Sequence, residues 1–391
     1  MSVTRGISTR HGQVDDGWWA ATAVLTVLAA TVLLGFEHGR SWYYFADAAD
    51  LVSVPTTDGG GLAMYRRHPE FQFGPPAVAL AWLVGRLPGW LEVWTVMVFG
   101  SLTGVVVLRA ILRRSSAFVS RDLAGWMVPV VTVGFLSLWL RLAAYSTHID
   151  DVAALSLAVG VGIASDRRRP FVAGALIGLA AAFKPWAVVF FPLVLITGPG
   201  KRVRAFAIAG VVAAVWWLPF VLQPGTIEAL RSFRIDVDPN SGIHALGLLD
   251  ATTPPWLRAV QLALAGGAAT AAALRLRRWP PVLLTGVAAR LLIDPATHHY
   301  YTAGLGVAGL AWELDRWPAR LPWRTATVAA VLELAAFDVH LAGFMPAIRF
   351  AAILSIAGCA LSRRPGEEEH HADGDTSPLV AAFSAASDSP S

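Results

Sequence analysis

About a dozen apolar segments run through this chain of 391 residues, and the loops between them alternate in chemical character. One set of loops is basic, with Arg113, Arg114, Arg167, Arg168, Arg169, Lys201, Arg202, Arg204, Arg275, Arg277, Arg278, Arg363 and Arg364. Basic loops of a membrane protein stay in the cytoplasm. The other set is therefore expected on the outer face. It contains Asp47, Asp50, His68, His148, Asp150, Asp151, Asp236, Asp294, His298 and His299.

The composition supports a membrane protein. Hydrophobic residues make up 55% of the chain and charged residues only 15%, whereas soluble domains carry about 25% charged residues. The net charge of +4 comes from short basic loops, which meet anionic lipid, so membrane lipids are expected as partners and nucleic acid is not. Cys359 is the single cysteine, which excludes an internal disulfide. There is no glycine-rich nucleotide loop, and we expect no cofactor.

The expected fold class is all-α, a polytopic integral membrane protein with about 12 transmembrane helices. Several apolar segments fall short of the roughly 20 residues that a straight crossing needs, so some helices are expected to be broken or re-entrant. Residues 75–88 are expected to re-enter or lie at the interface, because a full crossing there would move the next basic loops outside. The expected spans are 17–36, 89–112, 122–142, 152–165, 170–183, 186–198, 203–222, 256–274, 280–293, 301–314, 323–337 and 346–362.

Three regions follow along the chain. Residues 1–16 are expected to form a cytoplasmic N-terminus, residues 17–364 the transmembrane domain, and residues 365–391 a disordered cytoplasmic tail, because that tail is polar and rich in Ser and Ala. Two outer loops, 37–74 and 223–255, are long. Long loops within a compact domain are usually functional.

The first outer loop holds the candidate catalytic acids. Asp47 and Asp50 lie in an aromatic-rich stretch, and in a helix they would share one face. A carboxylate at the membrane surface among aromatic rings is suited to general-base chemistry. The alternative is an amphipathic helix on the bilayer, with both acids facing water. His68 and Gln72 follow later in the same loop and are candidates for sugar or acceptor contacts.

A second cluster opens a helix with His148, Asp150 and Asp151. A histidine and two aspartates can bind a substrate hydroxyl or a metal, although we assign no metal here. Helix capping and first-turn acids are the alternative explanation for the two aspartates.

Two cations are expected at membrane depth. Lys184 precedes Pro185 between two apolar runs, where a lysine can bind a lipid phosphate or extend its ammonium toward headgroups. Arg290 lies inside an apolar segment, where charge is costly and often functional, although an ion pair with Asp294 also explains it. His298, His299 and Tyr301 follow at the outer end and fit either sugar contacts or interfacial anchoring.

Three sequence blocks are similar to those of a known family: Met64-Tyr65 with Phe71-Gln72-Phe73-Gly74-Pro75-Pro76, then His148-Ile149-Asp150-Asp151, and finally the run from Gly178-Leu179 to Lys184-Pro185. By these blocks the chain resembles the GT-C superfamily of membrane glycosyltransferases. Within it, the chain is most similar to the actinobacterial polyprenol-phosphate-mannose-dependent α-mannosyltransferases, over most of residues 17–362.

The resemblance implies transfer of a sugar, expected to be mannose, from a polyprenyl-phosphate donor to a glycolipid or glycan acceptor. The reaction would take place on the outer face of the plasma membrane, with both termini cytoplasmic. It implies an aspartate base in the first outer loop, for which Asp47 is the first choice and Asp50 the second. Lys184 and Arg290 are assigned to the donor phosphate. Sugar and acceptor contacts are assigned to His68, Gln72, His148, Asp150, His298, His299 and Tyr301.

Two alternatives stay open. The usual position of the family's aspartate falls near Arg40-Ser41 in this chain, which would suit a catalytically inactive lipid-binding protein. A transporter or flippase of lipid-linked sugar would also carry broken helices and intramembrane charge. The absence of an internal sequence repeat favours the enzyme.

Overall fold

The computed structural model describes residues 16–35, 39, 41–115, 121–247, 252–318, 320–336 and 344–362. The expected N-terminal segment before Asp16, the pair Arg363/Arg364 and the tail 365–391 lie outside these residues, so the expectations for them stay predictions.

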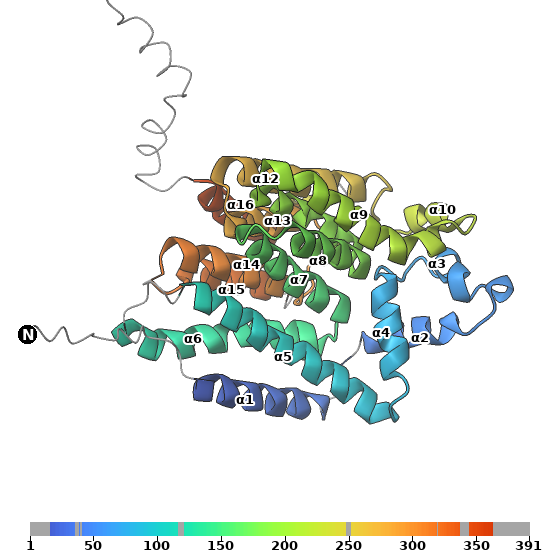
Figure 1. The fold of residues 1–391 in the computed structure, drawn as a ribbon, viewed down its shortest axis with the longest axis horizontal. Coiled ribbons are helices and arrows are strands. Elements are labelled where there is room, and N and C mark those ends of the chain that lie inside the picture. The colour runs from blue at the N-terminus through green and yellow to red at the C-terminus, as the bar shows by residue number, and fades with distance from the viewer. Residues whose placement is uncertain are drawn as a thin grey trace, which may run out of the picture.

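The described residues are helical, as the sequence predicted, and contain no strand beyond one isolated bridge between Asp236 and Thr252 (Figure 1). The α-helices are α1 (Asp16–Leu34), α2 (Trp42–Val52), α3 (Met64–Arg67), α4 (Pro75–Val84), α5 (Gly89–Ser115), α6 (Arg121–Leu140), α7 (Ile149–Asp166), α8 (Pro170–Phe183), α9 (Pro199–Val221), α10 (Thr226–Ser232), α11 (Gly242–Ala245), α12 (Leu257–Leu276), α13 (Trp279–Leu292), α14 (Tyr301–Arg316), α15 (Trp323–Ala336) and α16 (Met345–Leu361). Tighter or wider helical turns form η1 (Thr56–Asp58), η2 (Gly61–Ala63), η4 (Arg141–Tyr145) and η5 (Pro185–Thr197).

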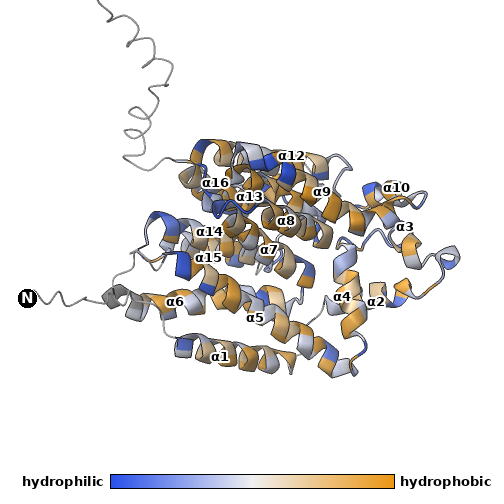
Figure 2. Ribbon diagram, in the orientation of Figure 1, coloured by the Kyte–Doolittle hydropathy of each residue, from blue (hydrophilic) through white to orange (hydrophobic). Residues whose placement is uncertain are grey.

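Five helices within the described part of the chain are long and apolar enough to cross a membrane: Asp16–Leu34, Gly89–Ser115, Gly125–Tyr145, Pro199–Val221 and Leu257–Leu276. Apolar residues dominate α1, α5, α8 and α9 (Figure 2). Phe99, Val133 and Val211 on these long helices are exposed. Large exposed apolar surfaces are rare on soluble monomers, so these faces indicate a membrane-embedded protein.

The break predicted at Lys184-Pro185 is present. Helix α8 ends at Phe183, Lys184 adopts an extended conformation, and the 3₁₀-helix η5 begins at Pro185. A proline has no amide hydrogen to continue the α-helical ladder, and it disfavours a helical residue before it. Each half is too short to cross the bilayer alone, so the break leaves Lys184 between two packed helical pieces.

Small residues let α8 and α9 pack closely. A Cβ atom at Gly174 would lie 2.5 Å from the carbonyl oxygen of Ala205, and one at Gly178 would lie 2.5 Å from that of Ala209. Small residues four apart on both helices allow such backbone contact in membranes. The contact fixes the end of α8, and therefore the position of Lys184.

We predict that Gly178→Leu lowers the free energy of unfolding by about 1–3 kcal/mol or more, because the new side chain must push α9 away. Gly210→Leu on α9 is the matched control, since nothing lies within 4 Å of a Cβ atom there. Thermal unfolding in detergent measures both. Equal stability of the two variants would contradict the close packing of α8 and α9.

The short helices α2, α3 and α10 lie together at one end of the molecule, toward the right of Figure 1. The start of this region is joined to the end of η4, because the amide of Gly39 donates to the carbonyl of Tyr145 and that of Ser41 to the carbonyl of Ser146. The first predicted outer loop therefore lies against the residues that lead into α7.

Candidate functional site

Five side chains form a buried polar cluster, which we call the carboxylate centre: His148, Asp150, Asp151, Lys184 and Trp186. The first three come from the N-cap and first turn of α7, Lys184 lies at the break after α8, and Trp186 lies at the start of η5. Asp150 is fully buried and Asp151 is 4% exposed. The two aspartates lie in the first turn of α7, where the helix dipole stabilises negatively charged side chains. The N-cap is His148, which makes no capping hydrogen bond, so capping does not account for the cluster.

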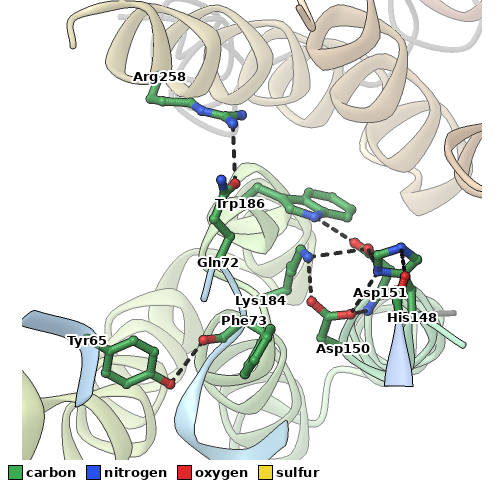
Figure 3. Close-up of polar contacts among 10 residues, drawn as sticks. Tyr65, Gln72, Phe73, His148, Asp150, Asp151, Lys184, Trp186 and Arg258 are labelled. Carbon is green, nitrogen blue, oxygen red and sulfur yellow. Dashed lines mark hydrogen bonds and ion pairs between the residues drawn. The ribbon is translucent and has the colours of Figure 1, made fainter. Parts of the chain in front are cut away.

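The ammonium of Lys184 bridges the two carboxylates (Figure 3). It donates a hydrogen bond to Oδ2 of Asp150 and lies 3.4 Å from Oδ2 of Asp151. The indole of Trp186 donates to Oδ1 of Asp151 at 2.8 Å. Oδ2 of Asp151 is buried and accepts no hydrogen bond from the described residues. One oxygen of Asp151 is thus held in place, while the other keeps its capacity to accept a hydrogen bond.

His148 links the carboxylate centre to the first loop. Its Nε2 lies 3.1 Å from the hydroxyl of Ser41, and its Nδ1 is 3.8 Å and 3.9 Å from the carboxylates of Asp150 and Asp151. The ring packs on Tyr300 with centroids 3.9 Å apart. The imidazole is therefore positioned at the edge of the centre, between α7, the first loop and the start of α14.

The arrangement offers metal ligands but already contains a cation. One ligand atom from each of His148, Asp150 and Asp151 lies within 4.8 Å of the others. Lys184 lies between the carboxylates and compensates one of their two negative charges. A divalent ion would have to displace this ammonium, so the residues present fit a lysine-bridged pair of acids better than a metal site.

A second polar cluster surrounds Arg290. Its guanidinium pairs with Asp294 at 3.0 Å, which confirms the ion pair that the sequence offered as an alternative. Gln261 donates to Asp294 at 3.0 Å. Arg258 donates to Gln261 at 3.4 Å and to Gln72 at 3.3 Å. Gln72 of the first loop is therefore joined to α12 and α13.

Aromatic rings join the two clusters. The Arg290 guanidinium lies 4.2 Å from the ring centre of Trp186 and 4.9 Å from that of Tyr301. Tyr300 stacks on His298 with centroids 5.1 Å apart. Partial burial lowers the pKa of His298 below its usual value, which favours a neutral imidazole near pH 7. The result is a polar region walled by aromatic side chains, as binding sites for sugars and other amphipathic ligands often are.

Other predicted residues lie apart from the carboxylate centre. Asp47 and Asp50 are exposed on α2, about 9 and 14 Å along the helix from Ser41. Their common face is as predicted, and it is the exposed face. His68 contacts Glu70 at 2.9 Å and stacks on Phe71. The roles of these three residues stay predictions.

His299 points to a different neighbourhood from His298. Its Nδ1 lies 3.4 Å from a guanidinium nitrogen of Arg141 and 3.2 Å from Oε2 of Glu333. Arg141 and Glu333 form an ion pair between η4 and α15. The two consecutive histidines therefore contact different sets of side chains.

Several residues of the two clusters were not among the predicted site residues. Asp151 was a candidate for binding a substrate hydroxyl or a metal but not for the general base, and Trp186 directly follows the predicted break. Arg258 with Gln261 and the lone acid Glu333 lie inside predicted spans. Polar residues inside an apolar segment are expensive and often functional, so these three carried a usable signal.

No protein-family model matches this chain, and no curated protein matches it.

Proposed function

We propose that this protein is a membrane glycosyltransferase of the GT-C type, which moves a sugar from a polyprenyl-phosphate donor to a glycolipid or glycan acceptor. In this proposal, twelve helices cross the plasma membrane, both termini are cytoplasmic and the reaction takes place on the outer face. Mannose is the proposed sugar. The buried acids at the loop-bearing end of an apolar helical bundle support this placement, since the basic loops follow the opposite ends of the helices.

The observation that carries the proposal is the unequal environment of the two oxygens of Asp151. Trp186 donates to Oδ1, whereas Oδ2 accepts no hydrogen bond within the described part of the chain and faces the ammonium of Lys184 at 3.4 Å. Oδ2 therefore keeps the capacity to accept a hydrogen bond from a substrate hydroxyl. We therefore propose Asp151 as the general base, in place of the exposed Asp47 and Asp50 of the sequence-based prediction.

In the proposed reaction, one bond to the anomeric carbon of the donor forms while another breaks. The acceptor hydroxyl gives its proton to Asp151 as its oxygen forms a bond to the anomeric carbon of the donor. The bond from that carbon to the phosphate oxygen breaks, and the electron pair leaves with polyprenyl phosphate. The acceptor attacks from the face opposite the phosphate, so the configuration inverts. The proton passes later from Asp151 to water.

Lys184 and Arg290 have different proposed roles. Lys184 holds Asp150 and Asp151 in one arrangement, since it contacts both. Nε of Arg290 is buried and donates no hydrogen bond to the described residues. It is therefore the donor that we assign to a phosphate oxygen, because hydrogen bonds from arginine to phosphate are strong.

A reconstitution experiment tests this function. Protein in liposomes receives a radiolabelled polyprenyl-phosphate mannose and an extract of membrane glycolipids. The proposal predicts label on a new lipid. Movement of intact donor between the leaflets without a new product would instead identify a flippase, and saturable binding with neither result would identify a lipid-binding scaffold.

A further inference from the structure

Arg258 is a cation of the second polar cluster whose charge is not compensated. It lies in the first turn of α12 and is partly exposed. Among the described residues, no carboxylate lies within 4.0 Å of its guanidinium, which donates to the side-chain oxygens of Gln72 at 3.3 Å and Gln261 at 3.4 Å. Figure 3 shows the contact with Gln72. Arginine stays protonated in proteins, and an amide oxygen carries no full charge, so the site keeps an unbalanced positive charge here.

The neighbouring cations are in a different situation. Lys184 contacts two carboxylates, and Arg290 pairs with Asp294. Arg349 also has no acid within 4.0 Å in the described part of the chain, but only 3% of it is exposed, and it donates to two backbone carbonyls. Among these four cations, Arg258 alone combines a missing acid with a partly exposed side chain, which a ligand can reach.

The two hydrogen bonds of Arg258 are ones that a ligand can replace. Their lengths of 3.3 and 3.4 Å exceed the usual range for such bonds, about 2.7–3.2 Å. A carboxylate or phosphate oxygen forms shorter and stronger hydrogen bonds with a guanidinium, often two at once. Arginine also has more N–H donors than these two contacts use. An anion is therefore the ligand that Arg258 is best suited to bind.

A series of contacts connects Arg258 to the proposed base. Gln261, which accepts from Arg258, donates to the backbone carbonyl of Arg290. The Arg290 guanidinium lies 4.2 Å from the ring centre of Trp186, and that indole donates to Asp151. Trp186 is partly exposed, as Arg258 is. The uncompensated cation therefore belongs to the same contact network as the carboxylate centre.

We propose that Arg258 binds an anionic group of the acceptor, a phosphate diester or a carboxylate, while the acceptor hydroxyl lies at Asp151. The role in acceptor binding rests on the proposed function. The donor carries one phosphate, which is assigned to Arg290, so a second cation without an acid calls for a second anion. Gln72 joins Arg258 to the first outer loop. The acceptor is thus an acidic glycolipid or glycan, and a neutral analogue binds more weakly.

Two pairs of mannosyl lipids test this preference, and the members of each pair differ by one charge. The first pair is a lipid with a phosphate diester and its methyl triester, and the second is a lipid with a uronic acid and its methyl ester. Binding of each radiolabelled lipid to the full-length protein in nanodiscs is corrected for binding to empty nanodiscs. We expect the charged member of one pair to bind about tenfold more tightly than its ester. That pair identifies the anion as phosphate or carboxylate.

Three variants show whether Arg258 causes the preference. Arg258→Gln should abolish it, because glutamine has no charge, and Arg258→Lys should retain part of it. Arg275→Gln is the matched control, since Arg275 is exposed in the last turn of the same helix. This control should keep the wild-type preference. Binding of polyprenyl-phosphate mannose should be the same in all three variants as in wild type.

Equal binding of the charged and neutral lipids by wild type, or an unchanged preference in Arg258→Gln, would overturn the proposal. An equal loss of donor binding and acceptor binding in Arg258→Gln would also overturn it, because Arg258 would then serve the donor phosphate or the fold. A preference that depends on Arg258, without any sugar transfer, would keep the anion site and reject the transferase. Sugar transfer without such a preference would do the reverse.

Discussion

Replacing Lys184 with methionine is expected to lower the free energy of unfolding by about 3–5 kcal/mol, the usual effect of removing one partner from a buried ion pair. Among the described residues, Lys184 and His148 are the basic side chains that contact both Asp150 and Asp151, and the ammonium of Lys184 lies closer to each carboxylate. Without it, two carboxylates face each other in a buried position. The rate of sugar transfer should also decrease, because Lys184 no longer holds Asp151 in a fixed position.

Lys201→Met is the matched control, since Lys201 is exposed and, among the described residues, its ammonium donates only to the carbonyl of Arg168. Thermal unfolding in detergent compares the two variants, and Lys184→Arg should restore part of the lost stability by keeping the charge. If Lys184→Met and Lys201→Met unfold at the same temperature, the lysine does not bridge the two acids.

Gly74→Ala is expected to have the second large effect, by separating the first loop from the site. The amide of Gly74 donates to the carbonyl of Phe183 at 2.7 Å, directly before Lys184. A Cβ atom at Gly74 would overlap the carbonyl oxygen of Ala182. This overlap cannot be relieved by turning a side chain, so the loop must move. Gln72 would then lose its hydrogen bond from Arg258.

We expect Gly74→Ala to cost about 1–3 kcal/mol or more of stability, as overpacking does, and to raise the KM for the acceptor. Gly89→Ala, where a Cβ atom meets nothing within 4 Å, should change neither quantity. Parallel measurements of unfolding and of acceptor dependence test this. A Gly74→Ala protein with the wild-type stability and KM would show that the loop does not depend on this backbone contact.

The sequence was informative about helices because the membrane imposes a simple rule. Backbone groups in lipid must be paired within a helix, so each long apolar run must be helical. The helices at the twelve apolar segments follow from this rule, whereas the break at Lys184 follows from the missing amide hydrogen of Pro185. The rule gives no information on whether a short helix such as η5 crosses the bilayer.

The residues that make up the candidate site were harder to predict from the sequence. Local spacing placed Asp47 and Asp50 on one helix face, but it could not show that this face is exposed. The contacts among Lys184, Asp150 and Trp186 join segments about 35 residues apart, and Arg258 reaches Gln72 across 186 residues. Such pairs depend on how helices pack, which residue type and local periodicity do not specify.

The most direct test of the proposed mechanism compares initial rates of sugar transfer for wild type, Asp151→Asn and the double variant Asp47→Asn/Asp50→Asn. Asparagine keeps an oxygen for the indole of Trp186 but cannot accept the proton. The account predicts a loss of about 10²–10⁴-fold for Asp151→Asn, the usual contribution of a general base, and near wild-type transfer for the double variant. Unchanged transfer by Asp151→Asn, or its loss only in the double variant, would contradict the account and return the base to the first loop.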